Sequence, residues 1–101
     1  MATYTANICV NAATTANVVD TINLTCPATQ LMVTNLDHTG YTIYLRFADA
    51  SQGAATPTVG GNDCYAISHN PGSRTIFPIS GASIQVKVIA GGTQNYSVAV
   101  I

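Results

Sequence analysis

The densest group of chemically versatile side chains in the sequence lies in the stretch PTVGGNDCYAISH, residues 57–69. It contains Cys64, with an aspartate directly before it and His69 five residues after it. A nucleophilic cysteine needs a base within hydrogen-bonding reach, usually in an electropositive and partly exposed setting. Extended chain places His69 at least a strand length from Cys64, which is too far for that role. We therefore predict that this stretch is a turn leading into a strand.

Other patterns for catalysis or metal binding are equally poor. Asp37 and His38 are adjacent, so their side chains diverge, and no serine has the surroundings of a nucleophile. The cysteines and histidines lack C-x-x-C and H-x-x-x-H spacing, and the four aspartates are isolated from one another. The Gly60-Gly61 pair lacks the lysine and the following helix of a phosphate-binding loop. We predict no catalytic, metal-binding or cofactor-binding residues, no cofactor, and a protein that is not an enzyme.

The three cysteines and the five tyrosines leave alternatives open. We expect Cys9, Cys26 and Cys64 to be free, buried thiols, with a Cys9–Cys26 disulfide as the alternative. Tyrosine rings could stack on a sugar, for which Tyr44 and Tyr65 are the candidates, or be buried with the hydroxyl reaching the surface.

Charge is scarce throughout the chain. Of 101 residues only 7% are charged, with three basic and four acidic side chains and a formal net charge of −1. Three basic residues neutralise too few phosphates for nucleic-acid binding, and they are too few for attachment to an anionic membrane. The start of the chain has no signal-peptide pattern, so we expect synthesis and folding in a cytoplasm. A surface covered by Thr, Ser, Asn and Gln suits a protein that packs against neighbours.

The elements that position these residues are short strands. Thr, Val, Ile and Tyr are abundant, and apolar and polar residues alternate along most of the chain. The alternation predicts about eight strands, with DHTG (37–40) as a hairpin turn, residues 50–63 as a long loop, and the strands over 3–10, 18–26, 29–36, 41–49, 64–68, 74–79, 84–90 and 95–101. We place 29–36 at the centre of a sheet and expect Pro78 at a sheet edge or a strand end.

The predicted fold is all-β: a single antiparallel β-sandwich, Ig-like or jelly-roll-like, spanning 1–101 with a candidate N-terminal arm at 1–7. The inward positions of the strands predict a core of Ile22, Leu24, Leu31, Val33, Ile43, Leu45, Phe47, Ile84, Val86, Val88, Val98 and Val100.

The run IYLRFADASQGAATPTVGGNDCYAISHNPGSRTIF, followed by the closing GGTQNYSVAVI, resembles a pattern in small virion proteins of tailed bacteriophages of the actinobacteriophage type. The similarity covers residues 31–101. It implies a β-sandwich capsid decoration (cement) protein, located in the virion and made in the host bacterial cytoplasm. Its implied partners are the major capsid protein lattice and copies of itself, with a trimer favoured.

The leading hypothesis is thus a non-enzymatic structural protein that binds and stabilises an assembled phage shell. The alternative is a tail-associated or fibre module for carbohydrate binding or adhesion. Termini and long loops can reach a neighbour, and arginine is enriched at interfaces. The interface is therefore expected at Ala2, Thr3, Tyr4, Thr5, Arg46, Asp63 and Arg74.

Overall fold

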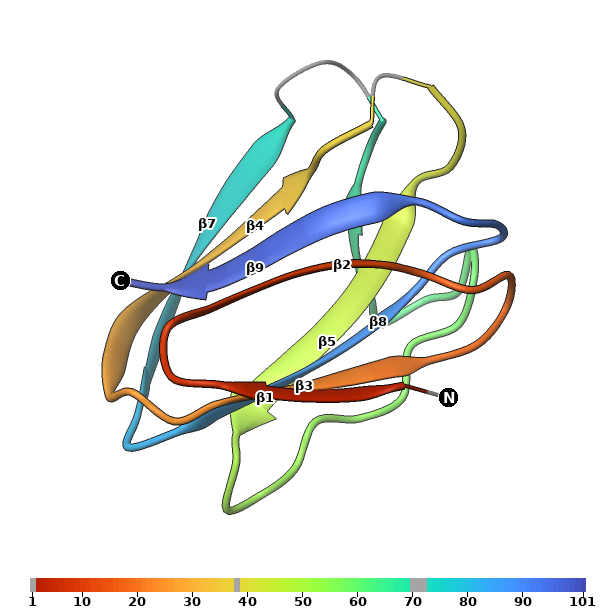
Figure 1. Cartoon of the computed structure of the whole chain (residues 1–101). Coiled ribbons are helices and arrows are strands. Elements are labelled where there is room, and N and C mark those ends of the chain that lie inside the picture. The colour runs from red at the N-terminus through yellow and green to blue at the C-terminus, as the bar shows by residue number, and fades with distance from the viewer. Residues whose placement is uncertain (1, 38, 70–72) are drawn as a thin grey trace.

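The regular elements of the chain are strands. The computed structural model describes residues 2–37, 39–69 and 73–101 (Figure 1). Within these ranges it has no helix. The strands are β1 (Thr3–Ala6), β2 (Cys9–Ala13), β3 (Asp20–Leu24), β4 (Ala28–Asn35), β5 (Ile43–Asp49), β6 (Tyr65–Ile67), β7 (Arg74–Gly81), β8 (Ile84–Ile89) and β9 (Asn95–Val100).

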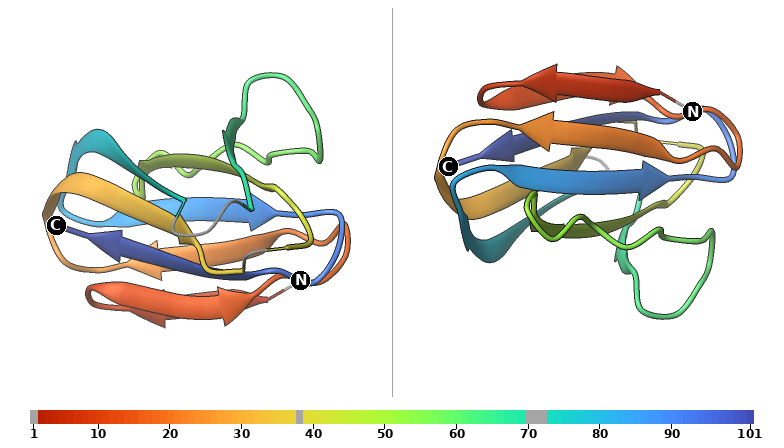
Figure 2. Two further views of the ribbon diagram at one scale, coloured as in Figure 1. Left: turned by 90° about the horizontal axis from the view of Figure 1, so that it is seen from above. Right: turned by 90° about the horizontal axis from the view of Figure 1, so that it is seen from below.

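The strands form two sheets that pack as a β-sandwich, which confirms the predicted fold class. Sheet A has the strand order β1-β3-β8-β5-β6, and sheet B has the order β2-β9-β4-β7. Figure 2 shows sheet B from one side of the molecule and sheet A from the other. The predicted places of two segments are confirmed, because β4 lies inside sheet B and β7, which contains Pro78, lies at its edge.

The pairing of strands follows a nested order. Strand β5 pairs with β6, β4 with β7, β3 with β8, and β2 with β9, all antiparallel. The chain is therefore wound like one long hairpin whose tip is the loop 50–64, and this winding is the jelly-roll arrangement. Strand β1 extends sheet A by pairing in parallel with β3.

The core lies between the sheets and consists of the inward residues of both. The predicted core residues are buried, except that Phe47 is only partly buried. The prediction missed Tyr96, which is fully buried (0% exposed) and is the largest such side chain. It also missed four buried polar residues: Thr14, Asp20, Asn35 and Gln94.

Two predictions about the connections were wrong. Residues 3–10 do not form one strand, because the chain leaves sheet A after Ala6 and enters sheet B at Cys9. Residues 37–40 do not close a hairpin, because β4 and β5 lie in different sheets. Gly40 nevertheless adopts the positive φ (108°) expected of it. His38, and residues 70–72 of the predicted turn before β7, lie outside the described residues.

All three cysteines are free, as expected, but their predicted burial was wrong. Cys9 is exposed on the outer side of β2, and Cys26 and Cys64 are partly exposed. The residues proposed as an N-terminal arm include β1, whose Thr3–Ala6 pair with residues 21–24 of β3.

Candidate ligand-binding site

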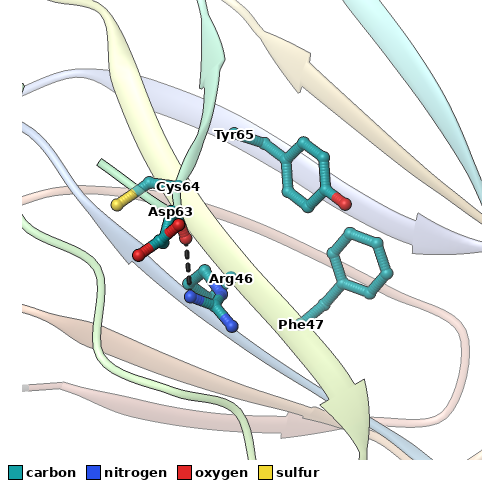
Figure 3. A pocket seen from close by; sticks show the side chains of 5 residues that line it. All are labelled: Arg46, Phe47, Asp63, Cys64 and Tyr65. Carbon is teal, nitrogen blue, oxygen red and sulfur yellow. Dashed lines mark hydrogen bonds between the residues drawn. The ribbon is translucent and has the colours of Figure 1, made fainter. Parts of the chain in front are cut away.

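The candidate site forms where β5 extends beyond the end of its short pairing partner β6. Strand β6 pairs with β5 only from Ile43 to Leu45, while β5 continues to Asp49. On the far side β5 stays paired with β8 up to Asp49. The open edge borders a pocket of about 550 Å³ lined by Arg46, Phe47, Asp63, Cys64 and Tyr65 (Figure 3).

One wall of the pocket is aromatic. The rings of Phe47 and Tyr65 are stacked, with centroids 5.4 Å apart and an interplanar angle of 20°. Phe77 of β7 packs against both, at 5.0 Å from Phe47 and 4.7 Å from Tyr65. Since β6 and β7 are edge strands of different sheets, this cluster closes the open side of the sandwich. Phe77 is buried, whereas Tyr65 is 50% exposed, so the cluster presents one tyrosine to solvent.

The opposite wall is polar. Arg46 points to the outer side of β5 and donates a hydrogen bond from Nη1 to the backbone carbonyl of Asp63 (2.6 Å; Figure 3). Asp63 has a positive φ of 61°, a conformation that aspartate tolerates better than most residues. The Cys64 thiol donates to the carbonyl of Asn62 (3.4 Å). The pocket therefore combines guanidinium donors and an exposed carboxylate with an aromatic surface.

The loop 50–64 is anchored over the outer face of sheet A. Its Ala54 N–H donates to Gln85 Oε1 (2.9 Å), and Gln85 Nε2 donates to Asn23 Oδ1 (3.1 Å). At the start of the loop Asp49 accepts hydrogen bonds from the backbone and hydroxyl of Ser51, and these bonds lower the pKa of Asp49. These contacts fix both the start and the middle of the loop that delivers Asp63 to the pocket.

The predicted site residues occupy three separate places. Arg46 and Asp63 meet in the pocket. Ala2, Thr3, Tyr4 and Thr5 lie at the opposite edge of sheet A, in or next to β1. Arg74 is in sheet B, where its Nη1 lies 3.8 Å from Met32 Sδ. Tyr44 lies on β5 outside the pocket lining.

A second exposed aromatic residue was missed by the sequence analysis. The ring of Tyr41, 45% exposed, covers Gly91 and Gly92, where a Cβ on Gly92 would collide with the ring. Its backbone N–H donates to Gln94 Oε1 (2.9 Å), and its carbonyl accepts from Asn35 Nδ2 (3.1 Å). The Gly-Gly pair was the available signal, but nothing in the sequence links it to a tyrosine fifty residues earlier.

Metal-binding groups and long helices are absent from the described part of the chain. No three His, Cys, Asp or Glu residues of that part converge to hold a metal ion. Likewise, none of its segments forms a helix with the length and apolarity to cross a membrane.

Comparison with known proteins identifies the fold. No family model matches the chain, and no curated protein matches it in sequence. A carbohydrate-binding module from a sugar cane soil metagenome, CBM_E1, has a TM-score of 0.58 at 15% identity, covering 98% of this chain and 90% of that one. The lysozyme inhibitor PliG of Aeromonas hydrophila gives 0.56 at 13%, covering 98% and 94%.

The pre-peptidase C-terminal domain of a Bacillus anthracis collagenase is also similar, with a TM-score of 0.52 at 15% identity and coverages of 99% and 93%. These matches identify no phage or virion family. At such low identities they show a shared fold alone. The chain is a small all-β sandwich that resembles carbohydrate-binding modules and pre-peptidase C-terminal domains.

Proposed function

We propose that the protein is a non-enzymatic binding domain that recognises a saccharide at the β5–β6 pocket. The observation that carries this proposal is the half-exposed ring of Tyr65, which is fixed by Phe47 and Phe77 in a pocket that Arg46 and Asp63 also line. A fixed ring loses little conformational entropy on binding. The apolar face of a pyranose stacks on such a ring, and its hydroxyls need nearby donors and acceptors.

The fold supports a binding role. Jelly rolls occur as lectin domains, and CBM_E1, which shares this fold, binds cellopentaose in its crystal structure. PliG, another neighbour, inhibits g-type lysozyme, so the same architecture also serves protein recognition. A saccharide is favoured here because one pocket is lined by a ring, a guanidinium and a carboxylate, with Phe47 and Tyr65 on one side of β5 and Arg46 and Asp63 on the other (Figure 3).

The proposal is tested by replacing the ring. In Tyr65→Ala we expect the Kd for a bound oligosaccharide to rise at least about tenfold, the equivalent of ~1.4 kcal/mol, because the stacking surface is lost. Tyr44→Ala is the matched control, since Tyr44 is also a strand tyrosine of sheet A but does not line the pocket. Binding is measured by calorimetry after screening a panel of oligosaccharides, with circular dichroism confirming that both variants fold. Absence of saturable binding across the panel, or equal loss in both variants, would contradict the proposal.

A second candidate function, capsid decoration, draws on the outer face of sheet B. Ile76, 50% exposed, lies opposite Met32, and Arg74 is the only charged residue among the outward positions of β2, β9, β4 and β7. An apolar, charge-poor sheet face suits attachment to another protein surface. The resemblance noted above suggests the major capsid protein lattice as that surface, with trimers of this chain in the virion.

Sedimentation of a native lysate separates the two candidates. Decoration predicts that the chain travels in high copy with DNA-filled heads. Migration with tails, or as a small free species, would contradict decoration and leave saccharide binding as the better account.

A further inference from the structure

Two of the three cations face each other on the outer side of sheet A. Arg46 of β5 and Lys87 of β8 are direct cross-strand partners in the antiparallel register. Their sequence neighbours Leu45, Val86 and Val88 are buried, so both side chains project from the outer face. Like charges directly opposite each other destabilise a sheet.

Within the described ranges, three of the four aspartates are engaged elsewhere, and the fourth, Asp63, lines the pocket with Arg46. Asp20 is buried and accepts from the Tyr96 hydroxyl, Asp37 accepts from Asn95, and Asp49 accepts from Ser51. Asp63 is the acid nearest to Arg46 in the chain's fold, but it offers its backbone carbonyl to the guanidinium. No ion pair joins Arg46 or Lys87 to a carboxylate among those residues.

The geometry points to an anion site on Arg46 and Lys87, and we infer that the preferred ligand is an acidic saccharide bearing a carboxylate. The inference rests on the proposed saccharide function and deepens it. Arg46 belongs to both features, since it lines the pocket beside Tyr65 and pairs across the sheet with Lys87. Tyr65 lies opposite the buried Leu45 and so faces the inner side of sheet A, whereas Arg46 faces the outer side. A saccharide that crosses the open edge of β5 can therefore stack on Tyr65 and place its carboxylate against the guanidinium, whose planar donors suit that group.

The surroundings of the pair fit this role. On the other side of β8, Thr21 of β3 lies opposite Lys87, and Thr3 of β1 lies opposite Thr21. The cross-strand row that begins with Arg46 and Lys87 therefore continues with two threonines toward β1. The Asp63 carbonyl holds Arg46 toward the pocket and uses one of its five N–H donors. The carboxylate of Asp63 works against anion binding, because this exposed side chain lines the same pocket and repels a negative charge.

The experiment compares a uronic-acid oligosaccharide with its carboxyl-reduced, neutral form, which keeps the same sugar backbone. We expect the wild-type protein at low ionic strength to bind the acidic form at least about tenfold more tightly, and the preference to shrink as salt is added. Arg46→Gln and Lys87→Gln should abolish the preference. Arg74→Gln, which removes the same charge from sheet B, should keep it, and Asp63→Asn should increase it.

The outcomes separate the inference from the proposed function. Equal binding of both forms, or equal loss of the preference in Arg74→Gln, overturns the anion site while saccharide binding stands. If neither saccharide binds, the proposed function fails, and a titration with inorganic sulfate followed by NMR decides the anion site. Shifts at Arg46 and Lys87 but not at Arg74 uphold it as a site for a free anion, and unchanged signals overturn it.

Discussion

At the scale of single residues, Tyr96 and Asp20 form a buried, hydrogen-bonded polar pair in the core. Asp20 is 1% exposed and accepts a hydrogen bond from the Tyr96 hydroxyl at 2.9 Å. Burial raises the pKa of Asp20 above its ordinary value of 3.8, although the hydrogen bond from Tyr96 opposes that rise. Burial and the nearby Asp20 charge also raise the pKa of Tyr96. The phenol therefore stays protonated and serves as the donor.

The shifted pKa of Asp20 predicts how stability depends on pH. A raised pKa means that the folded state binds the proton more tightly than the unfolded chain. The contribution of Asp20 is therefore fully present below pH 3.8 and is lost as the pH rises through the pKa of the folded state. We expect the free energy of unfolding to decrease from pH 4 to pH 7 more in the wild type than in Asp20→Asn.

Urea unfolding of both proteins across this pH range measures that difference. Asp49→Asn is the control, because the lowered pKa of Asp49 leaves its stabilising contribution fully present above pH 3.8, so that this contribution changes with pH only on the acidic side of 3.8. Parallel pH profiles for the wild type and Asp20→Asn would contradict the prediction.

At the scale of elements, a buried polar network joins β4 and β9 to the connection between β4 and β5. Gln94 Nε2 donates to Asn35 Oδ1 (2.7 Å) and to the Thr39 carbonyl (3.3 Å), while Gln94 Oε1 accepts from the Tyr41 N–H. The Gln94 N–H donates to Thr14 Oγ1 (3.0 Å), which lies just beyond β2. The network supplies the partners that the chain needs where it crosses from sheet B to sheet A.

Removing the centre of this network should be costly. In Gln94→Ala the Tyr41 N–H and Asn35 Oδ1 lose their side-chain partner, and each buried group left unsatisfied costs about 1–3 kcal/mol. Thr93→Ala, an exposed neighbour, is the matched control and should stay within ~0.5 kcal/mol of the wild type. The free energies are measured by urea unfolding, and equal destabilisation of the two variants would show that the network does not stabilise the fold.

Alternation in the sequence predicted the strands and the core well, because burial on one face leaves a period of two in any sandwich. Ile22, Leu24, Val86 and Val88 were identified in this way. It could not predict which sheet a strand joins, so the change of sheet at Asn7–Ile8 and the connection after β4 were missed. Arg46 and Asp63 were predicted as interface residues because arginine is enriched at interfaces and long loops reach neighbours. Neither was linked to Tyr65, because it is the β5–β6 register that brings them together.

At the scale of the whole molecule, the nested order makes the two halves of the chain depend on each other. Of the seven strand pairings in the described structure, only that of β1 with β3 lies within one half, if the chain is divided in the loop 50–64. Every other pairing joins β2–β5 to β6–β9. Pairings of this range in sequence make folding slow, since long loops must close before the contacts form.

Cutting the chain in that loop tests the dependence. A protease site placed between Gly60 and Gly61, which are remote from the strand pairs, should give fragments 1–60 and 61–101 that stay associated after cleavage. Native size-exclusion chromatography should show one species with the original circular dichroism, and denaturant should separate it into two disordered peptides. Fragment 1–60 folding by itself, or dissociation on cleavage, would contradict the prediction.

The position of the pocket at the tip of the winding has an evolutionary consequence. Insertions, deletions and substitutions in residues 55–62 leave the register of every strand pair unchanged, because none of these residues belongs to a strand. The same residues lead directly to Asp63 and thus border the ligand. Descendants of this chain can therefore diversify their ligand preference through loop length and composition while inheriting the same scaffold.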